Sequence, residues 1–122
     1  PPRPHLWIVH ELSITQALVD LIRKKAPENM KVEEVVIDVG ALTGLSVDSI
    51  GFYFEGLTQG GELTGARLVC RPVAARVRCQ GCGSVYEPED FIMMCPSCQT
   101  LGGEVLAGNE LNLIHLEGSQ RV

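Results

Sequence analysis

Two short segments, Cys79-Gln80-Gly81-Cys82 and Cys95-Pro96-Ser97-Cys98, decide how this chain is organised. They form the pattern C-x2-C-x12-C-x2-C, which brings two tight turns together and offers four thiolates in a tetrahedron. Zn2+ prefers soft sulfur donors in this geometry, and four protein ligands leave no open coordination position for catalysis. We therefore predict a structural zinc site, which would also stabilise an insert whose few large apolar side chains cannot form a core alone.

The sequence before the cysteines begins with a predicted helix and a predicted strand. Apolar residues recur at helical spacing between His10 and Lys25, and Ser13 and Gln16 are placed like a capping box at its start. Residues 32–39 alternate and are rich in β-branched side chains, so they are expected to form a strand that Gly40 closes.

A second helix and two further extended segments are predicted around the cysteines. Ser46 can cap the helix, which the pair Gly60-Gly61 is expected to end. Residues 66–78 read as one extended segment that Pro72 should interrupt, and residues 110–117 as another. The predicted fold class is therefore α+β, a small mixed sheet of about three strands with two helices, plus an inserted four-cysteine zinc ribbon.

Composition and charge exclude several classes of protein. The chain has 122 residues and a formal net charge of -5, and residues 79–98 contain no Lys or Arg, which disfavours nucleic acid as a partner. No apolar run approaches the ~20 residues that cross a bilayer, so no membrane association is expected. Five cysteines, an odd number, with two C-x2-C pairs favour a reducing, cytoplasmic setting. Of the remaining candidates, Cys70 is interpreted as a core thiol and His115 as a structural histidine.

Several motifs in this order resemble the HypA/HybF family. They are Val9-His10-Glu11-Leu12-Ser13-Ile14 at the start of a helix, Asp38-Val39-Gly40 with Leu42 at the end of a strand, Glu55-Gly56-Leu57, and the cysteine ribbon. The resemblance runs from about Val9 to Glu117. It implies a nickel metallochaperone for [NiFe]-hydrogenase maturation. The sequence itself has no nucleophile–base pair, phosphate loop or paired acids that would indicate catalysis, so we do not expect an enzyme.

The resemblance also implies the residues that bind each metal. His10 would be the nickel ligand, with Glu11 contributing mainly through its backbone, and imidazole with deprotonated amides suits square-planar Ni(II). Zinc, as the structural cofactor, would be held by Cys79, Cys82, Cys95 and Cys98. The implied partners are a GTPase of the HypB type and the precursor of the hydrogenase large subunit.

The resemblance gives expected domain boundaries. A nickel-binding α+β domain would comprise residues 9–78 with 105–118, and a zinc-ribbon domain residues 79–104. Residues 1–8 would be an N-terminal extension, because Val9 occupies the place of the family's initiator methionine. We hypothesise that the natural chain starts with methionine at position 9.

Two other functions remain open from the sequence. A zinc-ribbon protein–protein adaptor without a transferable metal would explain the insert and the acidic charge equally well. A small redox protein would hold iron at the same four sulfurs, as rubredoxin does. The edges of a three-stranded sheet also allow a homodimer.

Overall fold

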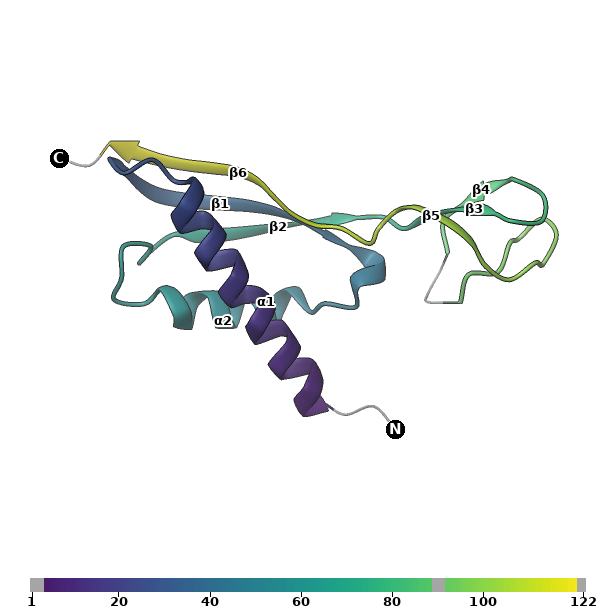
Figure 1. Cartoon of the computed structure of the whole chain (residues 1–122), viewed down its shortest axis with the longest axis horizontal. Helices are drawn as coiled ribbons and strands as arrows, with labels where there is room; N and C mark the ends of the chain where they lie inside the picture. The colour runs from purple at the N-terminus through teal and green to yellow at the C-terminus, as the bar shows by residue number, and fades with distance from the viewer. Residues whose placement is uncertain (1–3, 89–91, 121–122) are drawn as a thin grey trace. The chain divides into compact units, whose positions relative to one another are not determined.

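The computed structural model describes residues 4–88 and 92–120, with side chains described from Glu11 onward. Its elements follow the order α1 (Pro4–Lys25), β1 (Met30–Gly40), the 3-10 turn η1 (Ala41–Thr43), α2 (Val47–Thr58), β2 (Arg67–Val73), β3 (Arg76–Cys79), β4 (Val85–Tyr86), β5 (Gly103–Ala107) and β6 (Leu111–Gln120) (Figure 1). The strands form two three-stranded sheets with the orders β2-β1-β6 and β4-β3-β5. The predicted class, α+β with two helices and a cysteine ribbon, is confirmed.

The sheet β2-β1-β6 is mixed. Arg67 pairs with Glu34 and Arg71 with Asp38, each at 2.8 Å, so β2 and β1 advance in the same direction. β6 runs the other way, because the N–H of Gly40 donates to the carbonyl of Glu110 (2.8 Å) at one end while Gly118 lies against Lys31 at the other. A parallel pair needs a crossover connection, and α2 supplies it between β1 and β2.

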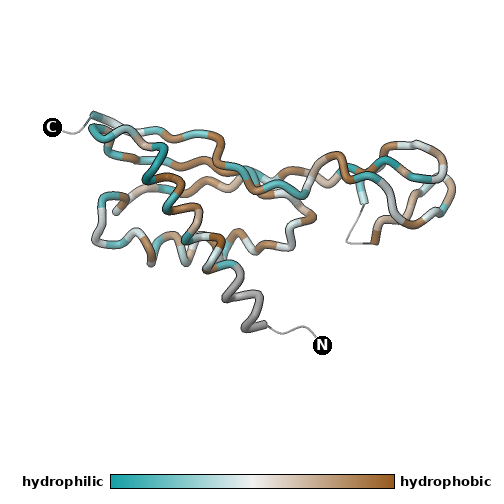
Figure 2. Tube along the Cα trace, viewed as in Figure 1, coloured by the Kyte–Doolittle hydropathy of each residue, from teal (hydrophilic) through white to brown (hydrophobic). Residues whose placement is uncertain are grey.

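Both helices lie on the same side of this sheet (Figure 1). Apolar and polar segments alternate along them, as expected of helices with one buried face (Figure 2). The core between helices and sheet is built from fully buried aliphatic and aromatic side chains, among them Ile22, Val35, Ile37, Ile50 and Phe54. The predicted cap of α2 is confirmed, since Ser46 Oγ accepts a hydrogen bond from the Ser49 N–H at 3.2 Å.

The start of α1 differs from the sequence-based expectation. α1 begins at Pro4, so Ser13 lies inside the helix and the capping box predicted for Ser13 and Gln16 was wrong. Proline suits the first position of a helix, because its missing N–H would have no partner there, so Pro4 is itself a helix-start signal. The end of α2 agrees with the expectation, since the helix ends at Thr58, Gln59 is its C-cap, and Gly60 follows with a φ of +79°. The Thr58 hydroxyl donates back to the Phe54 carbonyl at 2.8 Å.

The single extended segment expected over residues 66–78 is two strands. β2 continues through Pro72, and the break falls after Val73. β2 is an edge strand, where a residue without an N–H is tolerated on the open side, so the proline did not interrupt it.

The second sheet forms the ribbon. β3 pairs antiparallel with β4, placing Val77 opposite Tyr86, and antiparallel with β5, placing Cys79 opposite Gly103. Its small core consists of Val77, Cys79, Tyr86 and Cys95, against which Met93 and Val105 pack. β4 and β5 begin within residues 79–104, the expected zinc-ribbon insert, for which the sequence predicts no strand of its own.

The chain divides into two compact units. Of the described residues, one unit comprises residues 4–37, 45–70 and 113–120, and the other residues 38–44, 71–88 and 92–112. Among the described residues no helix combines the length and apolar character that a membrane crossing requires.

Gly40 and Gly108 let two backbone segments of the second unit approach each other closely. The Leu42 N–H donates to the Gly108 carbonyl at 2.7 Å. A Cβ at position 40 would lie only 2.1 Å from the Gly108 carbonyl oxygen. Gly108 itself has a φ of +101°, which only glycine adopts readily, and a Cβ there would lie 2.5 Å from the Cα of Ala75.

Candidate metal centre

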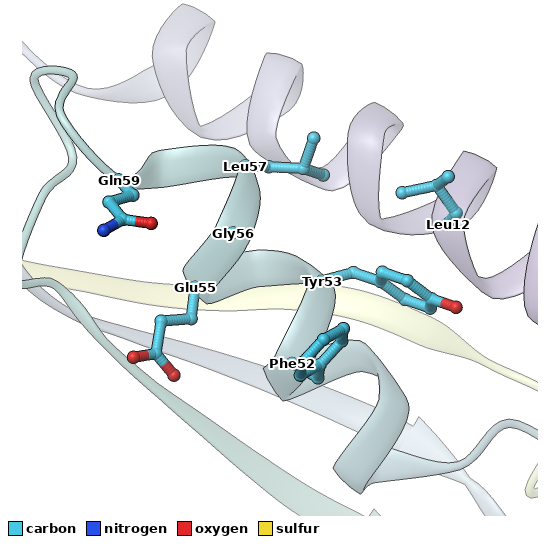
Figure 3. Close-up of a pocket in the computed structure, with 7 residues that line it drawn as sticks. All are labelled: Leu12, Phe52, Tyr53, Glu55, Gly56, Leu57 and Gln59. Carbon is cyan, nitrogen blue, oxygen red and sulfur yellow. The ribbon is translucent and has the colours of Figure 1, made fainter.

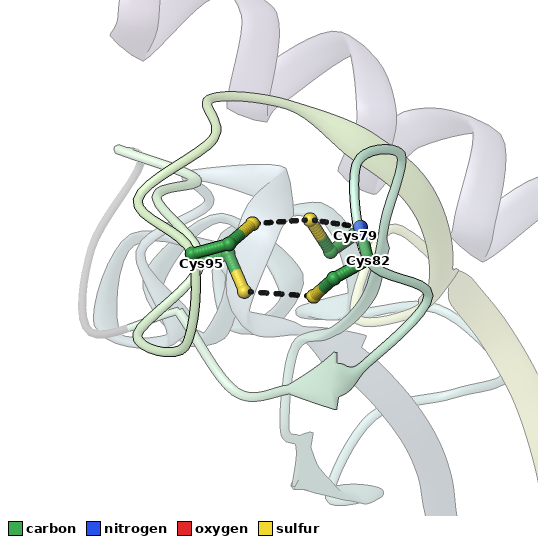
Figure 4. A group of neighbouring side chains, drawn as sticks. Cys79, Cys82 and Cys95 are labelled. Atoms are coloured by element: carbon green, nitrogen blue, oxygen red, sulfur yellow. Dashed lines mark hydrogen bonds between the residues drawn. The ribbon is translucent and has the colours of Figure 1, made fainter.

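The four cysteines predicted to bind zinc come together in the ribbon. Their ligand atoms all lie within 4.8 Å of one another, with Cys79 Sγ 3.5 Å from Cys98 Sγ and Cys82 Sγ 3.6 Å from Cys95 Sγ. Figure 4 shows the sulfurs of Cys79, Cys82 and Cys95 turned toward a common centre. Four sulfurs at ~2.3 Å from Zn2+ would form a tetrahedron with edges of ~3.8 Å, so the donor set fits this ion.

Each C-x2-C pair forms a turn, and in the first turn backbone N–H groups donate to a cysteine sulfur. Cys79 ends β3, and its Sγ accepts from the N–H groups of Gly81 (3.2 Å) and Cys82 (3.4 Å). The N–H of Cys82 is the main reason that the pKa of Cys79 lies below its usual value. A Cβ on Gly81 would lie 2.7 Å from the hydroxyl of Thr100, so the glycine lets the two turns approach each other.

The solvent-exposed cysteines, Cys82 and Cys98, each have a hydroxyl as neighbour. Cys82 Sγ lies 3.3 Å from Ser84 Oγ, and Cys98 Sγ 3.1 Å from Thr100 Oγ1. The hydrogen bond with the Ser84 side chain, followed by that with the Ser84 backbone, lowers the pKa of Cys82 to about 6. Cys82 therefore favours the thiolate at neutral pH, the form in which cysteine binds metal. The pKa of Cys95 is raised, because the hydrogen bonds from the backbone of Cys98 and Ser97 are outweighed by burial and by the sulfurs of Cys82 and Cys79.

Tyr86 closes the inner side of the cluster. Its ring is buried in the ribbon core, and its hydroxyl is buried without a hydrogen-bond partner among the described residues. Burial, followed by the negative charge of Cys79 and Cys95, raises the pKa of the phenol. The phenol therefore stays neutral, and its ring packs in the same core as the buried residues Cys79 and Cys95.

The residues implied for nickel lie in the first part of α1. The backbone of His10 belongs to α1, and its side chain lies outside the described residues. Glu11 is only 5% exposed, and its Oε2 accepts a hydrogen bond of 2.5 Å from the N–H of Ser46, the residue that caps α2. The carboxylate of Glu11 thus lies at the positive end of α2 and connects the two helices. Sequence reasoning could not find this contact, because 35 positions separate its partners.

Cys70 and His115 lie apart from the cluster. Cys70 in β2 is partly buried, and burial raises the pKa of its thiol. His115 in β6 is exposed and lies 3.1 Å from Glu117. Among the described residues no second group of three or more Cys, His, Asp or Glu side chains is close enough to hold a metal.

A groove of about 430 Å3 lies between α1 and α2. Leu12 contributes from α1, and Phe52, Tyr53 and Leu57 contribute from α2 (Figure 3). Phe52 is 73% exposed, and its ring meets that of Tyr53 edge to face at 5.5 Å. Among the described residues the lining of this groove is mostly apolar.

A family model described as hydrogenase/urease nickel incorporation, metallochaperone, hypA matches residues 9–118. The chain belongs to the HypA family. The hydrogenase maturation factor HypA of Geobacter metallireducens is 38% identical over 109 residues, which cover 89% of this chain and 98% of the relative. HypA of Caldanaerobacter subterraneus is 41% identical over 92 residues, 74% of this chain and 81% of the relative. The resemblance seen in the sequence motifs is confirmed.

Solved HypA structures share the fold. The solution structure of the Ni metallochaperone HypA from Helicobacter pylori matches with a TM-score of 0.64 and 23% identity, covering 91% of this chain and 98% of that one. A second HypA solution structure matches with a TM-score of 0.66, also at 23% identity, over 91% and 97% of the two chains.

Proposed function

We propose that this HypA-family protein binds Ni(II) near the start of α1, with His10 as ligand, and delivers it during maturation of [NiFe]-hydrogenase. The single observation that carries the proposal is the family match over residues 9–118, which begins just before His10-Glu11 and includes all four cysteines. In this proposal nickel is the cargo, Zn2+ at Cys79, Cys82, Cys95 and Cys98 is the structural cofactor, and the protein is not an enzyme.

The two proposed sites have chemistry suited to opposite tasks. Four thiolates within 4.8 Å of one another form a closed set that retains its ion. A site built on one imidazole and backbone amides has few donors and open positions, so it can release its ion to an acceptor. The proposed recipient of the nickel is the precursor of the hydrogenase large subunit, and the proposed partner in its delivery is a GTPase of the HypB type. Delivery would take place in the cytoplasm. The protein itself would act as a monomer or a homodimer.

α1 places a condition on nickel binding. Its hydrogen-bonded turns include His10 and Glu11, and in an α-helix each N–H is bonded to the carbonyl four residues earlier. Those amides can bind nickel only after the turns before Glu11 unwind. We therefore expect nickel to reduce the helical circular dichroism of the full chain, and to leave that of a chain beginning with Met at position 9 nearly unchanged.

Titration calorimetry with Ni(II) tests the proposal on zinc-loaded protein. The parent chain should bind one nickel ion, and His10→Ala should abolish binding. His115→Ala is the matched control, because it removes an exposed histidine of β6 and should bind nickel like the parent. Equal binding by His10→Ala and the parent, or none by either, would contradict the nickel assignment and favour the zinc-ribbon adaptor.

A further inference from the structure

The two C-x2-C turns of the ribbon have the same backbone geometry. In the first, the Gly83 N–H donates to the Cys79 carbonyl (3.0 Å), and the Cys79 N–H donates to the Ser84 carbonyl (2.8 Å). In the second, Gln99 donates to Cys95 (2.9 Å), and Cys95 donates to Thr100 (3.0 Å). Gly83 and Gln99, the residues after each pair, are both left-handed, with φ of +76° and +61°. Ser84 and Thr100 therefore occupy equivalent positions.

This geometry brings a hydroxyl to each exposed sulfur. The distances are 3.3 Å from Ser84 Oγ to Cys82 Sγ and 3.1 Å from Thr100 Oγ1 to Cys98 Sγ. The sulfur of the buried Cys79 instead accepts hydrogen bonds from backbone N–H groups of its own turn. A thiolate has no proton to donate, so once the cluster binds a metal both hydroxyls must act as donors.

We propose that Ser84 and Thr100 are positioning residues that hold the thiolates of Cys82 and Cys98 on the metal and thereby slow its loss through the exposed side of the cluster. Solvent, protons and competing chelators reach Cys82 and Cys98 first, because the other two sulfurs belong to buried residues. A donor beside each exposed thiolate offsets part of its negative charge and fixes its direction. The inference rests on the part of the proposed function that assigns a metal to the four cysteines.

Gly81 provides an independent route to the same hydroxyl. A methyl group at position 81 would lie 2.7 Å from Thr100 Oγ1 and 3.2 Å from Thr100 Cβ, so the threonine side chain would have to move. Gly81→Ala should therefore displace the hydroxyl from Cys98 although Thr100 itself is unchanged. The same loss of metal retention in Gly81→Ala and Thr100→Val would connect the effect to the position of the hydroxyl.

The test uses the full zinc-loaded chain and measures transfer of zinc to 4-(2-pyridylazo)resorcinol. Ser84→Ala and Thr100→Val should each release zinc roughly tenfold faster, and the double variant more, within the ~10–100-fold typical of outer ligand partners. Ser84→Thr and Thr100→Ser keep a hydroxyl and should release zinc like the parent. Ser97→Ala is the control, since Ser97 is exposed in the second turn and its hydroxyl bonds to no sulfur among the described residues.

The absorption spectrum of the Co(II)-substituted protein reports on the bonds between sulfur and metal, and a change in fold stability alone does not shift it. The sulfur-to-cobalt absorption band should shift in Ser84→Ala and Thr100→Val, and stay in place in Ser97→Ala. Parent-like release rates and spectra in both hydroxyl variants would overturn the inference, as would an equal change in Ser97→Ala. Metal analysis of the parent distinguishes failure of this inference from failure of the zinc assignment. A parent without bound metal would refute the zinc assignment itself.

Discussion

The contact between Glu11 and Ser46 predicts that the carboxylate stabilises the fold rather than binding nickel. Glu11→Ala removes both the charge and the acceptor at the start of α2, whereas Glu11→Gln keeps an oxygen and removes only the charge. A hydrogen bond to a charged acceptor contributes about 1.5–3 kcal/mol. A negative charge at a helix N-terminus contributes about 0.3–1 kcal/mol at the surface and up to about 2 kcal/mol when partly buried.

The expected loss follows from the surroundings of the two partners. Glu11 is 5% exposed, so its carboxylate interacts with α2 with little screening by water. Ser46 is exposed, so water can satisfy its N–H once the carboxylate is gone, which favours the lower part of the range. We expect Glu11→Ala to lower the free energy of unfolding by about 2 kcal/mol and Glu11→Gln by about 1 kcal/mol.

Urea unfolding of the zinc-loaded protein, followed by circular dichroism, measures these values. Glu55→Gln is the control, because Glu55 is an exposed residue of α2 away from its start and should change stability little. A loss below about 0.5 kcal/mol for Glu11→Ala would refute the reasoning, since that is the size of an ordinary surface change. Nickel titration of Glu11→Gln adds a second criterion: loss of nickel as complete as in His10→Ala would make the carboxylate a ligand.

Three further predictions concern the ribbon and β2. Removing the metal with a chelator should unfold the ribbon while α1 and α2 persist, which hydrogen exchange would detect as lost protection confined to the residues around the cysteines. Tyr86→Phe should leave stability unchanged or raise it in thermal unfolding, because the buried hydroxyl has no partner among the described residues; a loss above about 1 kcal/mol would reveal a missed hydrogen bond. Cys70 should react with iodoacetamide more slowly at pH 8 than an unstructured thiol and accelerate as pH rises, since burial raises its pKa and the thiolate is the nucleophile.

The parts of the fold that local sequence determines were predictable. Cysteine spacing predicted the cluster, Ser46 predicted the start of α2, and alternation over residues 32–39 predicted β1. In each case the physical cause lies within a few residues: a turn that aims two sulfurs, a hydroxyl that caps a helix, or a pleat that buries every second side chain.

The parts that failed depend on contacts between distant residues or on weak local signals. β4 is two residues long, and its strand character comes from pairing with β3 rather than from its own composition. Ser84 and Thr100 do form a pattern in the sequence, because each is a hydroxyl residue two positions after the last cysteine of its pair. The pattern indicates a contact with sulfur only once the structure shows that both turns have the same backbone geometry.

The glycine contact in the second unit affects how a mutational scan of this protein should be interpreted. Any side chain at position 40 or 108 would collide with backbone, at 2.1 Å from the Gly108 carbonyl oxygen in one case and 2.5 Å from the Ala75 Cα in the other. Substitutions there should score as severely as substitutions of the cysteines, although neither glycine has a side chain that could bind a metal. Measuring the metal content as well as the activity of the variants that still fold would separate these steric positions from true ligands. The two backbone contacts would then not be mistaken for part of the metal site.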